Sequence, residues 1–306
     1  MSGAVLRRRT STELERRALA CLCFILLGLL VSRSALADEA KDAGTLAWNP
    51  EWPKFRPSEY VVTGVAGAAS LGAFFLLNPP KSPHWTGGIL LDDDLRSALR
   101  LRSPTLRDAA RTASNWTAIT TVVVVVGVDS LLVPLLRHKP DVAMQLVLMD
   151  AESFAVSTLI TTSLFKTVGR TRPSYADCQR DPNFDSLCNS GATASFPSGH
   201  TNAAFTAAGL SCAHHLHLAL YGSPLADTLA CVGEIAIAGS TGGLRVMGDR
   251  HYASDVWAGA IIGFAAGYGM PTLLHYGKAG ATTQASLVVQ PVSASFPFGP
   301  AISGTF

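Results

Sequence analysis

The sequence has 306 residues, of which 48% are hydrophobic and only 15% are charged, and its mean hydropathy is +0.28. This length allows a substantial hydrophobic core, and the composition is oily for a soluble protein. The formal net charge of +2 argues against a nucleic-acid-binding protein, which needs concentrated basic surface.

The first 37 residues have the features of an export signal. The apolar run from Ala18 to Val31 is followed by a small-x-small cleavage site, Ala35-Leu36-Ala37. Basic residues precede the run: Arg7, Arg8, Arg9, Arg16 and Arg17. The run is short for a membrane span, which needs about 20 apolar residues. We expect a signal peptide over 1–37, with an uncleaved anchor as the alternative, and then a polar linker over 38–57.

Apolar stretches follow whose lengths favour helices over strands. They cover residues 60–78, 114–136, 143–166, 200–220, 227–244 and 251–276. The charged segment 91–111 is predicted to form a polar or amphipathic helix. The expected fold class is all-α, with a helical domain over 58–278 and a C-terminal tail over 279–306 whose alternation fits a short β-hairpin.

The apolar stretches raise the question of membrane spans. Thr117 to Leu136 is almost uninterrupted apolar sequence, but acidic residues and a histidine cluster interrupt the other stretches, and charge at membrane depth is costly. These residues are Asp129, Asp150, Glu152, Glu234, His214, His215 and His217. We predict membrane association, with a soluble periplasmic bundle as the alternative.

Four cysteines remain beyond the predicted signal. Cys178 and Cys188 bracket a short polar loop, which a disulfide would tie down in an oxidising compartment. Cys212 and Cys231 lie in apolar helical stretches, where buried free thiols are expected. No metal site is predicted, because neither a zinc-like ligand spacing nor a carboxylate cluster is found.

Three polar clusters lie at helix boundaries, and each has residues suited to phosphate chemistry. The first is Lys-Thr-Val-Gly-Arg-Thr-Arg-Pro over 166–173, and the second is Phe-Pro-Ser-Gly-His-Thr over 196–201. The second opens a helix, where free backbone N–H groups and the Ser198 hydroxyl would bind an oxyanion. In the third, over 245–255, His251 and Asp255 are four residues apart, so on a helix Asp255 would accept a hydrogen bond from the imidazole and orient it.

The ordered combination of these clusters resembles the type 2 phosphatidic acid phosphatase family (PAP2), which shares its core with bacterial class A acid phosphatases and vanadium haloperoxidases. The family pattern is a Lys before Arg-Pro, then Pro-Ser-Gly-His, then Arg with His and Asp downstream. The resemblance covers roughly residues 90–276. Two positions depart from it: Phe165 stands where the family has Lys, because Lys166 is one residue closer to Arg172, and Leu244 stands where Ser is usual.

The resemblance implies a six-helix bundle and a metal-independent phosphohydrolase without a cofactor, acting through a phosphohistidine. It implies His251 as nucleophile, His200 as general acid and Asp255 as the residue that orients His251. The implied phosphate-binding residues are Lys166, Arg172, Ser198, Gly199 and Arg245. Arg170 is the alternative to Lys166 for the first of these positions.

Several alternatives stay open for the substrate and for the activity. Lipid phosphates or diphosphates, such as phosphatidate, phosphatidylglycerophosphate or a polyprenyl diphosphate, suit an oily bundle. The alternatives are a soluble periplasmic acid phosphatase on small phosphomonoesters, a vanadium-dependent haloperoxidase, and a non-catalytic envelope protein that binds phosphate headgroups. No nucleic acid and no obligate protein partner is inferred.

The expected location is the cell envelope of a bacterium, with the active site facing the periplasm. A cleaved signal followed by a spanning 60–78 conflicts with this location, because helix parity would then put the site in the cytoplasm. A first stretch that does not span, or a wholly periplasmic bundle, would remove the conflict.

Overall fold

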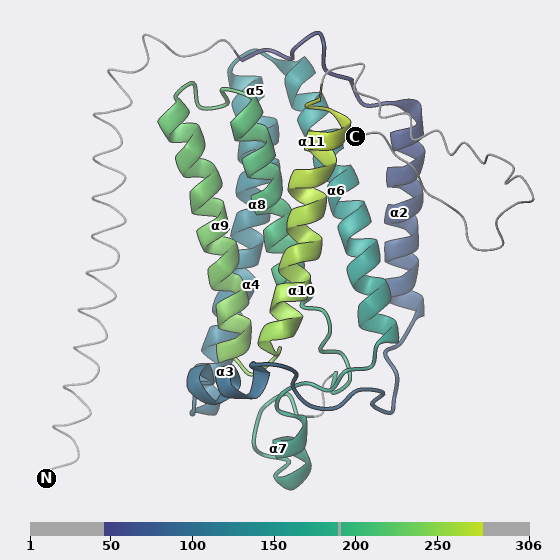
Figure 1. The fold of residues 1–306 in the computed structure, drawn as a ribbon, viewed down its shortest axis with the longest axis vertical. Coiled ribbons are helices and arrows are strands. Elements are labelled where there is room, and N and C mark those ends of the chain that lie inside the picture. The colour runs from purple at the N-terminus through teal and green to yellow at the C-terminus, as the bar shows by residue number, and fades with distance from the viewer. Residues whose placement is uncertain (1–45, 189–190, 278–306) are drawn as a thin grey trace, which may run out of the picture.

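A computed structural model describes residues 46–188 and 191–277, and within these residues the regular structure is helical, with no strand (Figure 1). The all-α expectation is therefore confirmed for this part of the chain. The predicted signal peptide over 1–37 and the predicted hairpin over 279–306 lie outside the described residues.

The long helices run roughly parallel or antiparallel to one another along the molecule (Figure 1). Each predicted apolar stretch overlaps one of them. Proline stands in the first turn of α2, α4, α6 and α9, where its missing N–H costs nothing. The bounds are α2 Pro57–Leu76, α4 Pro104–Val122 continuing through η1 Val123–Leu132 and α5 Val133–Leu136, α6 Pro140–Thr167, α8 Gly199–His217, α9 Pro224–Met247, and α10 Ala253–Phe264 continuing through η2 Ala265–Gly269 and α11 Met270–Leu274.

The charged segment 91–111 differs from the single helix predicted for it. It forms α3 (Asp92–Leu99) and the first turns of α4, with a break between them. Ser103 is extended, with ψ 132°, because the residue before a proline is disfavoured in the helical region. The charges are not a solvated face: Arg96 of α3 binds Asp177 of the short helix α7 (Tyr175–Arg180) and Asp249 of the turn between α9 and α10.

Helix α8 lies in the middle of the bundle and packs against α10, η2, α9, α6 and α4, whereas α2 lies outside against α6 (Figure 1). Most of its side chains are buried. A helix surrounded on all sides has no solvated face, which explains its even apolar pattern. The start of α8 is therefore held from several directions.

Residues 46–56 are packed against the bundle, which corrects their prediction as a polar linker. Leu46, Trp48 and Phe55 are buried in one apolar cluster with Leu146 of α6 and Tyr276 beyond α11. The tryptophan and phenylalanine rings bury a large apolar area, and this outweighs the polar residues between them. The helical domain thus includes at least part of the predicted linker.

Five helical segments of the described chain are long and apolar enough to cross a membrane: Pro57–Leu76, Pro104–Leu136, Pro140–Thr167, Pro224–Met247 and Ala253–Leu274. The acidic residues that interrupted the apolar pattern, Asp129, Asp150, Glu152 and Glu234, are all buried inside the bundle. Charged groups in membrane proteins face the bundle interior in the same way. The structure is thus compatible with membrane association.

A close contact between α8 and α10 joins two of the polar clusters. A Cβ on Gly259 would lie 2.5 Å from the Ser198 carbonyl oxygen, and a Cβ on Gly263 would lie 2.3 Å from that of Asn202. Only glycine allows this approach. The Ser198 N–H also donates to the Asp255 backbone carbonyl at 3.0 Å. The start of α8 and the start of α10 are therefore fixed side by side.

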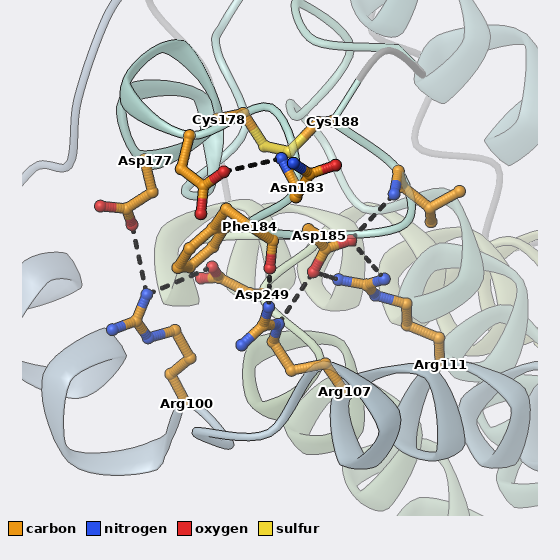
Figure 2. The surroundings of a disulfide bond; sticks show 12 residues. Arg100, Arg107, Arg111, Asp177, Cys178, Asn183, Phe184, Asp185, Cys188 and Asp249 are labelled. Atoms are coloured by element: carbon orange, nitrogen blue, oxygen red, sulfur yellow. Dashed lines mark hydrogen bonds and ion pairs between the residues drawn. A yellow bond between two sulfur atoms is a disulfide. The ribbon is translucent and has the colours of Figure 1, made fainter.

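A disulfide joins Cys178 of α7 (Tyr175–Arg180) to Cys188, the pair for which the sequence predicted a bridge. The loop that it closes contributes Asp185, a nearly inaccessible carboxylate that accepts hydrogen bonds from Arg107 and Arg111 of α4 (Figure 2). This loop is thereby fixed to the first turns of α4.

Cys212 and Cys231 also form a disulfide, which corrects the expectation of buried free thiols. Cys212 lies on α8 and Cys231 on α9, with their Cα atoms 4.4 Å apart. The sequence places both in apolar helices, but only the packing of the two helices brings them together.

We expect Asp185→Ala to lower the free energy of unfolding by about 3–5 kcal/mol, because it leaves two arginines, Arg107 and Arg111, without their shared buried carboxylate. Thermal unfolding of the purified protein measures the change. Asp108→Ala is the matched control: Asp108 also pairs with Arg111, but its side chain is 47% exposed, so its loss should cost less than about 1 kcal/mol. Equal losses from the two variants would contradict a buried structural role for Asp185.

The same carboxylate makes the stability depend on acid pH. Burial alone would raise the pKa of Asp185, but the hydrogen bonds from Arg111 and Arg107 outweigh it and lower the pKa to about 2, from an ordinary 3.8. The unfolded chain therefore binds a proton here at higher pH than the folded protein does. This contribution to stability is present above pH ~4 and is lost as the pH falls toward 2. Asp185→Ala should flatten that part of the stability curve.

Candidate active site

A cavity of about 820 Å³ lies where the loop from α6 to α8, the loop from α9 to α10 and the start of α8 meet. One part of its wall is cationic and polar and the other is apolar. The polar part comprises Asn115, Arg172, Gly199, His200, Arg245, Arg250 and His251. The apolar residues are Phe74, Ala118, Ile119, Val122, Val123, Phe165 and Ala203, and Thr161 and Thr162 of α6 also line the cavity. This division suits an amphipathic ligand with an anionic end.

Arg172 is held at the cavity by the loop that follows the disulfide. Its backbone N–H donates to the Ala192 carbonyl at 2.8 Å, and its Nε donates to the Gly191 carbonyl at 3.1 Å. Its Nη1 donates to the Arg250 carbonyl at 2.6 Å and lies 3.2 Å from Nε2 of His251. The guanidinium is thus fixed against the histidine ring.

The partners of His251 assign its tautomer. Nδ1 lies 2.7 Å from the Ser195 carbonyl oxygen, which can only accept, so Nδ1 carries the proton. Nε2 is then unprotonated, and its lone pair accepts a hydrogen bond from Arg172 Nη1 at 3.2 Å. His251 is buried, and burial together with the charges of Arg172 and Arg245 holds its pKa well below the ordinary 6.5. The ring is therefore neutral at pH 7 and presents an unprotonated nitrogen at the cavity.

Asp255 does not make the hydrogen bond with His251 that the sequence predicted. Its Oδ2 is 3.9 Å from Nδ1, because His251 precedes the first residue of α10 and the two residues do not share a helical face. Ser195 bridges them instead: its carbonyl accepts from His251, and its hydroxyl donates to Asp255 Oδ2 at 2.6 Å. Asp255 is therefore linked to His251 through Ser195.

Arg170 lies behind Asp255, on the side away from the cavity. It is fully buried, and its Nη1 donates to Asp255 Oδ1 at 2.6 Å and its Nη2 to Asp92 Oδ2 at 2.7 Å. Its guanidinium also packs between the rings of Trp85 and Tyr252. Arg170 is committed to these contacts and is not among the residues that line the cavity.

Lys166 is also directed away from the cavity. Its Nζ donates to the carbonyls of Phe74 and Leu77, at 2.9 and 2.6 Å, at the C-terminal end of α2. Its neighbour Phe165 lines the apolar wall instead. The structure therefore does not bring Lys166 together with the other predicted phosphate ligands.

The start of α8 contributes His200 and Gly199 to the cavity, but Ser198 lies behind the wall. Ser198 is fully buried, and its hydroxyl pairs with that of Thr201 at 2.8 Å. Gly199 is the first residue of the helix, where backbone N–H groups have no helical acceptor. Burial and the charges of Arg245, Arg172 and Arg250 lower the pKa of His200 to about 4.

Arg245 and Arg250 complete the cationic wall. Arg245, in the last turn of α9, donates through Nη1 to Ser114 Oγ at 3.0 Å and Asn115 Oδ1 at 3.3 Å. Its buried Nε has no hydrogen-bond partner. Within the described ranges, Arg172, Arg245 and Arg250 form no ion pair, although each is at least nine-tenths buried. Three buried positive charges without a carboxylate are costly unless an anion pairs with them, so this wall is a candidate anion site.

Residues 147–278 match the PAP2 superfamily. This part of the chain belongs to that superfamily. The match includes all three polar clusters and ends at residue 278, one residue beyond the last residue that the structure describes. A search of curated proteins and a search of solved structures found no match. Because members of the PAP2 superfamily are generally phosphatases that act on phosphate esters, membership implies an activity of the phosphatase type.

Two residues of this candidate site were not predicted from the sequence. Ser195 contacts His251 through its backbone carbonyl, and no side-chain pattern reports on that. Arg250 is adjacent to His251 in the chain, and a single arginine beside a motif residue is not distinguishable from a surface charge until its burial is known. Its lack of a pairing carboxylate is a three-dimensional property.

Proposed function

We propose that this protein is a phosphohydrolase that removes phosphate from lipid phosphates or diphosphates through a phosphohistidine intermediate, without a metal. One observation carries the proposal: a neutral histidine, His251, presents an unprotonated Nε2 beside three buried arginines that have no carboxylate partner within the described residues. Such a site combines an anion cradle with a nucleophile whose other nitrogen is fixed.

In the first step, Nε2 of His251 attacks the phosphorus, and the bond from phosphorus to the leaving oxygen breaks. The electron pair of that bond goes to the leaving oxygen, which receives a proton from His200. His251 then carries the phosphoryl group on Nε2, and the Ser195 carbonyl stabilises the positive ring through the Nδ1–H. Asp255 is a positioning residue in this scheme, since it fixes Ser195.

In the second step, His200 accepts a proton from a water molecule as the water oxygen attacks phosphorus. The N–P bond breaks, its electron pair returns to Nε2, and inorganic phosphate is formed. Arg172 and Arg245, together with the Gly199 N–H, would stabilise the charge on the phosphoryl oxygens in both steps. Fixed donors of this kind usually supply the largest share of the acceleration.

The apolar half of the cavity supports a lipid substrate. Phe74, Ile119 and Val123 belong both to the cavity wall and to the exposed apolar surface, with exposures of 58%, 51% and 57%. The cavity wall is therefore continuous with the face that would contact acyl chains. A small soluble phosphomonoester would leave this apolar wall in water.

The Cys178–Cys188 disulfide lies at the same end of the bundle as the site, and the Cys212–Cys231 disulfide joins the later turns of α8 to the early turns of α9, toward the other end. Disulfides persist in oxidising compartments, so the two bonds support export to the periplasm, and a wholly periplasmic bundle accommodates both. Helix α2 begins at the opposite end of the bundle from α3 and α7 (Figure 1). If the bundle spans the membrane with the site facing the periplasm, Pro57 lies on the cytoplasmic side. Carbonate extraction and N-terminal sequencing of the mature protein test this topology.

We expect the purified full-length protein to release phosphate from phosphatidate, phosphatidylglycerophosphate or a polyprenyl diphosphate in mixed micelles, and EDTA should leave the rate unchanged. Phosphate release measured by colorimetry, with kcat/KM compared against glycerol 3-phosphate, tests the preference for a lipid. A higher kcat/KM for glycerol 3-phosphate would favour a soluble phosphatase. Bromide oxidation with vanadate and peroxide would favour a haloperoxidase, and binding of phosphate without release would favour a non-catalytic protein.

A further inference from the structure

We infer that Arg250 is a phosphate-binding residue of this site and supplies the cationic contact that Lys166 does not make. The inference rests on the proposed function, since it adds a ligand to the same anion cradle. Four observations carry it: the position of Arg250, its lack of partners, the occupation of nearby carboxylates and the commitment of Lys166.

Arg250 lies on the cavity wall with Arg172, Arg245, His200 and His251. It follows Asp249, a residue with a left-handed backbone (φ 57°) in the turn between α9 and α10. Two hydrogen bonds fix this turn: the Arg250 N–H donates to the Arg245 carbonyl, at 3.1 Å, and its carbonyl accepts from Arg172, at 2.6 Å. Arg250 is thus rigidly placed between the two other arginines.

Arg250 is 9% exposed, and its guanidinium makes no ion pair or side-chain hydrogen bond with any residue in 46–188 or 191–277. The acidic residues near it are engaged elsewhere. Asp185 binds Arg107 and Arg111, and Asp249 binds Arg96. An arginine this buried without a carboxylate needs an anion from outside the chain.

Repulsion among the three buried arginines also favours the binding of an anion. Burial and the charge of Arg111 lower the pKa of Arg250 to about 10, and the charge of Arg250 in turn lowers the pKa of Arg172. A bound phosphoryl group would relieve this repulsion. The cost of keeping three like charges together is typical of a functional site that trades stability for binding.

The chain offers Lys166→Gln as a matched control for Arg250→Gln, since each removes one positive charge near the site. We expect Arg250→Gln to lower kcat/KM for phosphatidate by about 10- to 100-fold, the loss of charge-assisted hydrogen bonds to one oxyanion. Lys166→Gln should stay within about threefold of the unsubstituted protein, because Lys166 caps α2. Arg250→Lys should recover part of the loss, since it restores the charge without the planar fork.

Binding of orthovanadate, a phosphate analogue, tests the inference independently of turnover. By isothermal titration calorimetry with the purified full chain, Arg250→Gln should weaken vanadate binding by at least about tenfold and Lys166→Gln should not. A second readout separates binding from structure: without any anion, Arg250→Gln should keep or raise the melting temperature, and vanadate should raise it less than in the unsubstituted protein. An arginine with a structural role would lower it.

The outcomes also separate this inference from the proposed function. Vanadate binding that depends on Arg250, with no hydrolysis of any phosphate ester, would overturn the function and leave the inference standing. Hydrolysis with unchanged vanadate affinity in Arg250→Gln would overturn the inference alone. Absence of vanadate binding by the unsubstituted protein at millimolar concentration would also overturn the inference.

Discussion

Replacing His251 with alanine is expected to reduce phosphate release by about 10⁴-fold or more, which corresponds to about 5 kcal/mol of transition-state stabilisation. The phosphoryl acceptor has no substitute within reach, since the one other histidine on the cavity wall, His200, is assigned to proton transfer. Steady-state phosphate release from phosphatidate measures the loss. His138→Asn is the control, because His138 lies on an exposed turn after α5 and outside the cavity.

The intermediate itself gives a second test of His251. Substrate labelled with ³²P, quenched within one turnover in alkali, should leave label on the unsubstituted protein and on His138→Asn. A phosphohistidine is stable in base and labile in acid, which distinguishes it from a phosphoserine. His251→Ala should carry no label while it retains its helical circular dichroism and melting temperature. Near-normal turnover by such a folded variant would refute the nucleophile assignment.

The helices were predictable because they depend on local sequence. Apolar stretches of helical length predict α2, α6 and α9 within a few residues, whereas α4 begins at Pro104, well before the predicted stretch 114–136. The break at Ser103 within the charged segment was missed, although Pro104 is visible in the sequence. A proline at the first helical position and one that interrupts a helix differ only in what precedes them.

The site was predictable where a residue acts alone through its side chain. Arg172, Arg245, His200 and His251 line one cavity, as the three polar clusters indicated. The prediction of a hydrogen bond between His251 and Asp255 was wrong, because it assumed that both residues lie on a helix. The role of Ser195 depends on a backbone carbonyl brought in by the loop that precedes α8. Contacts of this kind depend on how segments meet in space.

The spacing of the first cluster is the clearest case of a local signal with a non-local consequence. Lys166 is displaced by one residue, and one residue on a helix is a rotation of about 100°. Its ammonium therefore meets the end of α2, and Phe165 lines the cavity instead. The cavity thus lacks the Lys166 ammonium, but an arginine without a carboxylate partner, Arg250, lies elsewhere on its wall. The sequence shows the shifted position of Lys166, whereas the unpaired state of Arg250 is visible only in three dimensions.

Replacing His200 with alanine should have an effect that depends on the leaving group. For an alkyl phosphate the departing alkoxide is strongly basic, so kcat/KM should fall by about 10²–10⁴-fold. For an aryl phosphate with the same apolar tail, the phenolate needs little protonation, and the fall should be about tenfold or less. Dodecyl phosphate and 4-dodecylphenyl phosphate form a suitable pair. The ratio kcat/KM is the right measure, because it excludes the later hydrolysis step in which His200 also acts.

The pH dependence of kcat/KM tests the same proton transfer. Burial and the three arginines keep the pKa of His200 near 4 in the anion-free site, so the histidine is neutral at pH 7. The proton that His200 passes to the alkoxide must then arrive with the substrate, whose second phosphate pKa is about 6. For dodecyl phosphate, kcat/KM should therefore fall about tenfold per pH unit above that value and level off below it. In His200→Ala with the aryl substrate this slope should disappear. Equal losses for both leaving groups, with the slope intact, would show that His200 serves binding and not proton transfer.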